Sequence, residues 1–119
     1  MLTQIQQLEI IAQLALTALL CMLIGLDRER SAKPAGLRTH MLAGMGACLF
    51  TALGLKAFPV ADTSRVAAGV VSGIGFLGAG TIFREQARVR ALTTAASIWA
   101  TAAVGMAVGV GAWLLAIGA

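Results

Sequence analysis

Charged residues divide this chain into long stretches that contain none. Asp, Glu, Lys and Arg are absent from residues 10–26, 39–55, 66–83 and 91–119, and they occupy the gaps between these runs. A transmembrane helix needs about 20 predominantly apolar residues to cross a hydrocarbon core of about 30 Å. The runs therefore predict an all-α, polytopic transmembrane helical bundle, with spans at about 8–26, 38–56, 65–83 and 92–108.

The composition supports a chain surrounded by lipid. Hydrophobic residues make up 59% of the 119 residues and charged residues 12%, whereas soluble domains have about 25% charged residues. A chain of this length forms one domain of ordinary size. We therefore expect residues 1–119 to be a single transmembrane domain with the lipid bilayer as its surroundings.

The last apolar run is too long for one span. At about 1.5 Å per residue, its 29 residues would extend roughly 43 Å as a continuous helix. Gly109-Val110-Gly111 is the natural place for a break. The sequence thus predicts four helices plus a partial fifth at 112–119, typical of a truncated five-span unit.

Basic residues indicate the orientation of the spans. Arginine and lysine are concentrated in the first loop, with Arg28, Arg30, Lys33 and Arg38, and in the third, with Arg84, Arg88 and Arg90. The positive-inside rule places these loops in the cytoplasm and the N-terminus outside. The first run ends in LDRER rather than at a small-residue cleavage site, so we expect a retained helix and not a signal peptide. This topology accounts for the net charge of +4 without a nucleic-acid partner.

Glycine is concentrated in the third span. Small side chains let helix backbones approach closely in lipid, where no hydrophobic effect drives association. We expect this glycine-rich helix to be central and to pack through Gly69, Gly73, Gly75, Gly78 and Gly80. Small faces on the second span (Gly44, Ala47, Thr51) and the fourth span (Thr94, Ser97, Thr101, Gly105, Gly109) are complementary. An alternative is a glycine-interrupted helix that unwinds to coordinate an ion.

The first span has a polar stripe. Gln6, Glu9, Gln13, Thr17 and Cys21 recur at spacings of three and four, which places them on one helical face. Polar groups are costly in contact with acyl chains, so this face should point inward. Alternatively, Gln6 and Glu9 lie at the outer interface and only Gln13 and Thr17 are buried. Cys21 and Cys48 are expected to be small packing residues without a disulfide.

Charged residues gather at the inner ends of the spans. Asp27 and Glu29 could pair with Arg38, Arg84 or Arg90, or the whole group could simply fix the topology. Asp27 and Glu29 are also the weak candidates for a metal ligand, because Mg²⁺ prefers carboxylate oxygens. His40 has no second His or nearby Cys, so a metal site built on it is not expected.

Three segments carry a resemblance to a known family. GLDRERSAKPAGLRTHMLAGMGACLF, RVAAGVVSGIGFLGAGTIFRE and VRALTTAASIWATAAVGMAVGVG together resemble the N-terminal membrane domain of the MgtC/SapB family of bacterial inner-membrane proteins. The resemblance implies a multi-span helical domain that is often followed by a cytoplasmic domain, which is absent from this sequence. It also implies an association with magnesium homeostasis and action on other membrane proteins.

The resemblance assigns polar residues to function. The family's acidic-arginine pair corresponds to Asp27 and Arg28, its AGLRT motif includes Arg38, and its outer arginine corresponds to Arg65. A further charged pair corresponds to Arg84 and Glu85. These six residues are the candidates for function.

The residues do not indicate an enzyme. One His and no Cys-His pair leave no plausible nucleophile or general base. Gly73, Gly75 and Gly78 match GxGxxG by letters but lack the strand-turn-helix context of a nucleotide site. We therefore expect a bacterial inner-membrane, multi-pass protein that acts as a regulatory module on partner membrane proteins. It should form a homo-oligomer and need no cofactor. The alternative is a transporter of magnesium or another ion, with its pathway through an oligomer.

Overall fold

Every regular element in the described part of the chain is a helix. The computed structural model describes residues 2–30, 36–56, 63–84 and 88–118, and side chains within these ranges except at 28–30, 63, 81–84 and 88–92. The helices are α1 (Gln4–Arg30), α2 (Leu37–Lys56), α3 (Thr63–Arg84), α4 (Arg88–Gly109) and α5 (Trp113–Gly118). The prediction of an all-α fold is confirmed. Each of the four complete predicted spans falls inside one of α1–α4, and α5 lies in the segment expected to hold a partial fifth.

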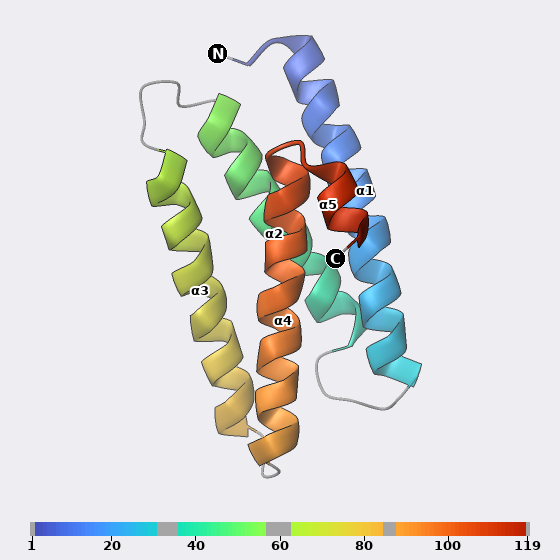
Figure 1. The fold of residues 1–119 in the computed structure, drawn as a ribbon, viewed down its shortest axis with the longest axis vertical. Coiled ribbons are helices and arrows are strands. Elements are labelled where there is room, and N and C mark those ends of the chain that lie inside the picture. The colour runs from blue at the N-terminus through green and yellow to red at the C-terminus, as the bar shows by residue number, and fades with distance from the viewer. Residues whose placement is uncertain (1, 31–35, 57–62, 85–87, 119) are drawn as a thin grey trace.

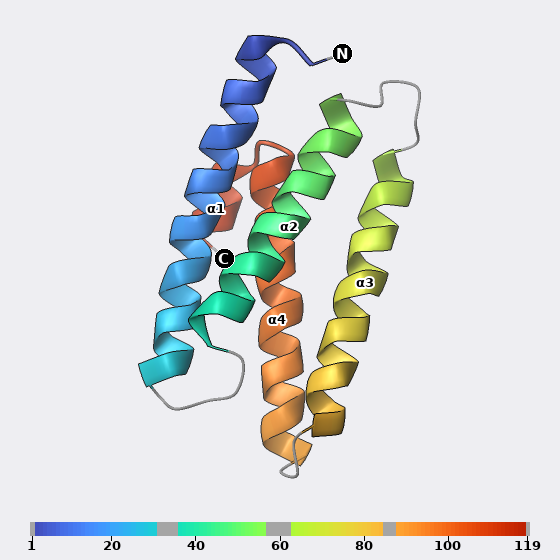
Figure 2. The same cartoon turned by 180° about the vertical axis from the view of Figure 1, so that it is seen from behind.

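Helices α1–α4 run alternately in opposite directions along the long axis of the molecule (Figure 1). Helices α2 and α4 lie in the middle, with α1 on one side and α3 on the other, as the view from behind also shows (Figure 2). The short helix α5 folds back beside α4 and α1, where Ala116 is buried in a cluster with Cys48 and Val108.

Local signals in the sequence fix two helix ends. At the start of α1, the Thr3 amide donates to Gln6 Oε1 at 3.0 Å and the Gln6 amide donates to Thr3 Oγ1 at 3.1 Å. This reciprocal pair is a capping box. At the end of α4, Gly111 adopts φ +89°, a conformation that glycine adopts without steric cost. The chain therefore turns within the segment where the sequence indicates a break.

The closest helix contact joins α2 and α4 through glycine. A Cβ atom at Gly105 would overlap the Gly44 carbonyl oxygen, and one at Gly109 would lie 2.8 Å from the Cys48 carbonyl oxygen. Only glycine allows the backbones to approach this closely. The small faces predicted on the second and fourth spans thus meet one another.

The glycine-rich helix α3 is not central, and that prediction is wrong for the single chain. Among the described side chains of α3, at 64–80, the buried residues form a narrow stripe of Val70, Ile74 and Gly78. Of the five glycines predicted to pack, Gly78 contacts Ala95 of α4, whereas a Cβ at Gly69, Gly73, Gly75 or Gly80 would meet open space. The spacing of glycines indicates that another helix could approach closely. Which glycines make such a contact depends on where the backbone of the neighbouring helix lies.

One described segment is long and apolar enough to cross a membrane by itself, namely Gln4–Asp27 in α1. The described apolar parts of α3 and α4 are shorter, at Ser64–Gly80 and Thr93–Gly109. Length and composition thus single out α1 among the described helices.

Candidate functional site

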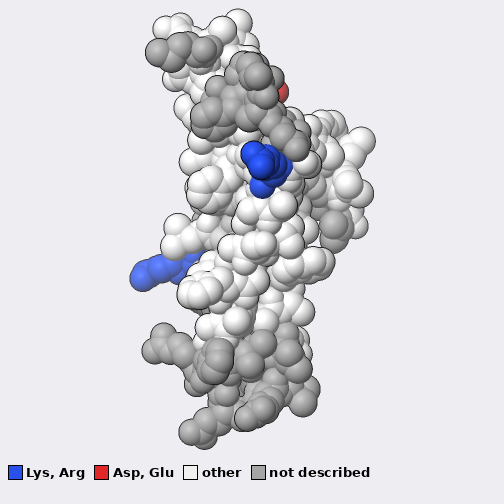
Figure 3. All heavy atoms as spheres, turned by 90° about the vertical axis from the view of Figure 1, so that its left-hand side faces the viewer, with Lys and Arg blue, Asp and Glu red and all other residues white. Residues whose placement is uncertain are grey.

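The structure does not gather the predicted charged residues into one site. Asp27 and Arg38 are exposed near the ends of α1 and α2 that face the first loop, whereas Arg65 is exposed at the beginning of α3, at the opposite end. No ion pair joins Asp27 to Arg38. The side chains of Arg28, Glu29 and Arg84, and all of Glu85, lie outside the described residues. On the face shown in Figure 3, the described basic side chains are separated by an uncharged surface.

The polar groups that do come together are buried between α1, α2 and α4. His40 is fully buried. Its Nδ1 lies 2.9 Å from the Gly36 carbonyl oxygen, and its Nε2 lies 2.8 Å from Ser97 Oγ. A carbonyl can only accept, so Nδ1 carries a proton and donates it. In the neutral ring, Nε2 then accepts from the Ser97 hydroxyl. The imidazole therefore joins the beginning of α2 to α4.

Hydroxyl groups continue this polar interior along the bundle. Thr17 Oγ1 donates to the Gln13 carbonyl at 2.9 Å, and Thr101 Oγ1 donates to the Ser97 carbonyl at 2.8 Å. Both threonines are buried, as is Thr94. Because a hydroxyl bonded to the carbonyl one turn earlier is already satisfied, its burial costs little. We call the set of His40, Ser97, Thr94, Thr101 and Thr17 the polar seam.

The His40–Ser97 pair has the distance of a nucleophile and its base. The Gly36 carbonyl also orients the ring, as the third residue of a catalytic triad orients its histidine. However, the ring is completely buried, so a substrate cannot reach Nε2. The geometry therefore fits a polar clamp between helices. Cys21 and Cys48 are also buried and free of disulfide, and Cys21 Sγ fills the space that a side chain at Gly44 would need.

The two interpretations of the first-span polar stripe apply to different parts of it. Thr17 and Cys21 are fully buried, and Gln13 is half-buried. Gln6 belongs instead to the capping box of α1. Glu9 forms an ion pair with Lys56 of α2, with 2.8 Å between Oε2 and Nζ. The stripe is therefore buried at Thr17 and Cys21 and partly or fully exposed at Gln6 and Glu9, and the placement of the first two residues at a membrane interface stays a prediction.

The Glu9–Lys56 ion pair should contribute modest stability. Lys56 is 18% exposed and its Nζ is buried, but the Glu9 side chain is 56% exposed, and water at the carboxylate keeps the pair near the range of exposed pairs, about 0–1 kcal/mol. Replacing Glu9 with Gln should lower the free energy of unfolding by about 0.5 kcal/mol, and the difference should vanish in about 1 M salt because the Debye length falls to about 3 Å. Chemical unfolding in micelles at low and high salt measures both values. A loss above about 2 kcal/mol that salt leaves unchanged would contradict this account.

Sequence reasoning missed three of these features. The Thr3-x-x-Gln6 pattern was a readable capping signal. The contacts of His40 with Ser97 and of Glu9 with Lys56 depend on which helices are neighbours. The spacing of residues within one helix therefore cannot predict them. Metal-binding side chains are not gathered either: no three His, Cys, Asp or Glu residues come together within the described ranges.

Comparison with known proteins places the chain in a family. The sequence model of the MgtC family matches residues 14–119. The chain belongs to the MgtC family. The resemblance seen in the three sequence segments is thereby confirmed.

Curated members of the MgtC family share nearly half of their aligned residues with this chain. YhiD of Escherichia coli strain K12, described as a candidate magnesium transporter, is 45% identical over 117 residues, covering 92% of this chain and 54% of YhiD. Protein MgtC of Salmonella typhimurium is 43% identical over 109 residues, covering 92% of this chain and 47% of that protein. Protein SrpB of Synechococcus elongatus is 40% identical over 119 residues, covering 88% of this chain and 65% of SrpB. The chain thus spans about half to two-thirds of these relatives. No solved structure matches it.

Proposed function

We propose that the chain is a multi-pass helical domain of the bacterial inner membrane. One observation carries this proposal: many large apolar side chains lie on the outside, whereas the inside includes many small and polar side chains beside a few buried isoleucines and valines. Phe76, Ile5 and Leu114 are 81%, 78% and 70% exposed, whereas Thr17 and His40 are completely buried. Water-soluble proteins rarely expose large apolar patches, whereas here many large apolar side chains are exposed, with at least one on each described helix, and helices in lipid pack through small residues and interhelical hydrogen bonds.

The dimensions and the basic residues support an orientation. The molecule measures 47 × 25 × 20 Å, and its long axis is comparable to a bilayer of about 40–45 Å with headgroups. The ends of α1 and α3, and the beginnings of α2 and α4, lie at the same end of the bundle. Arginines are concentrated in these segments, so we propose that this end is cytoplasmic and the N-terminus lies outside.

We further propose that the domain is a regulatory module tied to magnesium homeostasis, which acts on partner membrane proteins and forms a homo-oligomer. Family membership and the name of YhiD support the link to magnesium. The charges of the interior favour regulation over conduction, because the Glu9 carboxylate is paired with Lys56. The polar seam is bonded within the bundle, and Gln13 Oε1 and Thr51 Oγ1 are the buried polar atoms near it that have no partner among the described residues. Asp27, Arg28, Arg38, Arg65, Arg84 and Glu85 are the proposed contact residues. The domain is proposed to lack enzymatic activity and a resident cofactor.

Ion transport is the second candidate function, because the chain resembles a protein described as a candidate magnesium transporter. Such a pathway would run through an oligomer and would use oxygen ligands at the inner end, with Asp27 and Glu29 as candidates. Mg²⁺ keeps several of its waters and needs carboxylates to bind. Asp27 is exposed, which is compatible with an entry site.

A flux measurement separates the two functions. Proteoliposomes that hold the purified chain should show no Mg²⁺ uptake above empty vesicles, as followed with an encapsulated magnesium-sensitive dye. In cells that lack their own copy, the chain should restore growth at low Mg²⁺, and Arg65→Ala should lose that ability. Uptake by the wild type that disappears in Asp27→Asn, with Asp62→Asn as the control for loss of another acidic residue, would establish transport instead.

A further inference from the structure

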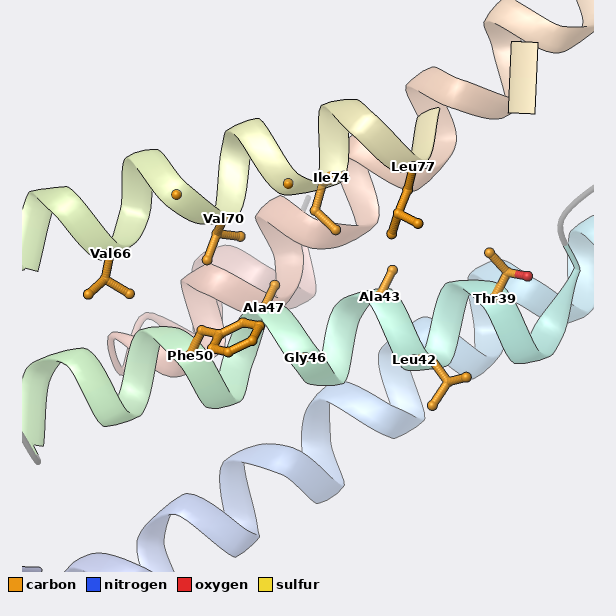
Figure 4. A pocket seen from close by; sticks show the side chains of 12 residues that line it. Thr39, Leu42, Ala43, Gly46, Ala47, Phe50, Val66, Val70, Ile74 and Leu77 are labelled. Carbon is orange, nitrogen blue, oxygen red and sulfur yellow. The ribbon is translucent and has the colours of Figure 1, made fainter. Parts of the chain in front are cut away.

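An open groove runs between α2 and α3 (Figure 4). It has a volume of about 620 Å³. One wall extends from Thr39 to Phe50 on α2, and the other extends from Val66 to Leu77 on α3. Because the helices are antiparallel, Thr39 and Leu77 lie at one end, and Phe50 and Val66 lie at the other.

The floor of the groove is formed by three glycines, which have no side chains to fill it. Gly46, Gly69 and Gly73 line it, and a Cβ atom at any of them would meet no other atom within 4 Å. Glycine in a helix interior is less favourable than alanine by about 1 kcal/mol, and no close contact with the described residues compensates for it at these positions. The three glycines leave the groove open along the described part of the chain.

The size of the groove and the charges at its ends indicate the occupant. Each wall extends over eleven residue steps, or about 16 Å as helix, close to the depth of about 15 Å of one leaflet of the hydrocarbon core. All lining residues are uncharged, and Thr39 supplies the one hydroxyl. An exposed arginine precedes each wall in the sequence, Arg38 before Thr39 and Arg65 before Val66, and neither is itself a lining residue. An apolar channel of this length with a basic residue near each end fits an acyl chain attached to an anionic headgroup.

The position of the groove selects the leaflet. Arg38 and Lys56 are eighteen residue steps apart, which is about 27 Å of helix, close to the thickness of about 30 Å of the hydrocarbon core. Along α2 the groove thus begins at the inner boundary and ends just past the middle of the helix, whereas along α3 it begins beside Arg65, near the outer end. The one hydroxyl of the lining, that of Thr39, lies at the Arg38 end, and this assigns the headgroup to that end. Arg38 and Thr39 also stand in the first turn of α2, where the helix end favours an anion.

We propose that this groove binds one acyl chain of an anionic phospholipid from the cytoplasmic leaflet. The phosphate is held by Arg38 and the Thr39 hydroxyl, and the chain lies over Gly46, Gly69 and Gly73. Basic pockets between transmembrane helices on the cytoplasmic side are suited to such headgroups. This inference depends on the proposed membrane orientation.

Native mass spectrometry of the full purified chain tests the site. The chain is titrated in micelles with dioleoylphosphatidylglycerol or dioleoylphosphatidylcholine, and the retained lipids are counted. The wild type should prefer phosphatidylglycerol by about fivefold, and Arg38→Gln should abolish the preference. Gly73→Leu, which fills the groove, should lose retention of both lipids. Gly75→Leu is the matched control, because Gly75 also faces open space but does not line the groove.

Each other result counts against the groove. Equal retention of the two lipids by the wild type would contradict recognition of the headgroup by Arg38. Unchanged retention in Gly73→Leu would show that the lipid does not bind in the groove. A dimer that Gly73→Leu dissociates, without lipid retention, would identify the occupant as a second copy of the chain. Circular dichroism and gel filtration of each variant verify that it is folded. A wild type that is monodisperse without detergent would instead contradict the proposed membrane location.

Discussion

Replacing Gly105 with alanine should separate α2 from α4 and lower the free energy of unfolding by about 3 kcal/mol, because overpacking a well-packed contact costs about 1–3 kcal/mol and sometimes more. The new Cβ would overlap the Gly44 carbonyl oxygen and lie 2.9 Å from the Gly44 carbonyl carbon and 3.2 Å from the Cys48 amide nitrogen. These are backbone atoms that no side-chain rotation can move. Unfolding with sodium dodecyl sulfate in mixed micelles, followed by circular dichroism at helical wavelengths, measures the change.

Gly75→Ala is the control for Gly105→Ala. It makes the same chemical change in another helix interior, but its Cβ would meet nothing. Its stability should stay the same or rise by up to about 1 kcal/mol, since alanine is the better helix former. Equal stabilities of the two variants would mean that α2 and α4 do not approach one another as closely as the structure has them.

Truncating His40 to alanine should also cost about 3 kcal/mol, because it leaves a cavity and removes the partner of Ser97. The ring is fully buried and bonded at both nitrogens. Ser97→Ala, which leaves Nε2 without this hydroxyl, should cost about 1–3 kcal/mol. The same micelle unfolding assay measures both variants.

A double-mutant cycle tests whether His40 and Ser97 act together. The double variant should be scarcely less stable than His40→Ala alone, because the second change removes a group that has already lost its partner. Thr39→Ala, at the neighbouring exposed position, should have little effect. Additive losses from the two single changes would show that the hydrogen bond between α2 and α4 contributes nothing.

Much of the fold is readable from the sequence, because charges and glycines act locally. Charge-free runs placed all four long helices, and Gly109–Gly111 marked the turn before α5. The role of α3 was not readable. Its glycine spacing equals that of Gly105 and Gly109, yet only the latter pair faces the backbone of another helix. The spacing of glycines describes the surface of one helix, whereas close packing also depends on the surface of the helix that faces it.

The candidate site was less predictable than the fold. Thr17 and Cys21 were placed in the interior by their helical period alone. His40 and Ser97 are 57 residues apart in the chain, and their contact requires α2 and α4 to be neighbours. The charged candidates were found by type and by resemblance, and their distribution over both ends of the bundle depends on the alternating direction of the helices.

The narrow buried stripe of α3 has a mechanical consequence. Helices α1, α2 and α4 are joined by interlocked backbones and by the polar seam, but α3 is held mainly through Val70, Ile74 and Gly78. Few of its described side chains are buried, so we expect a tilt of α3 to cost less packing than a tilt of α2 or α4. In the proposed membrane location, lateral pressure would therefore act first on the angle between α3 and α2.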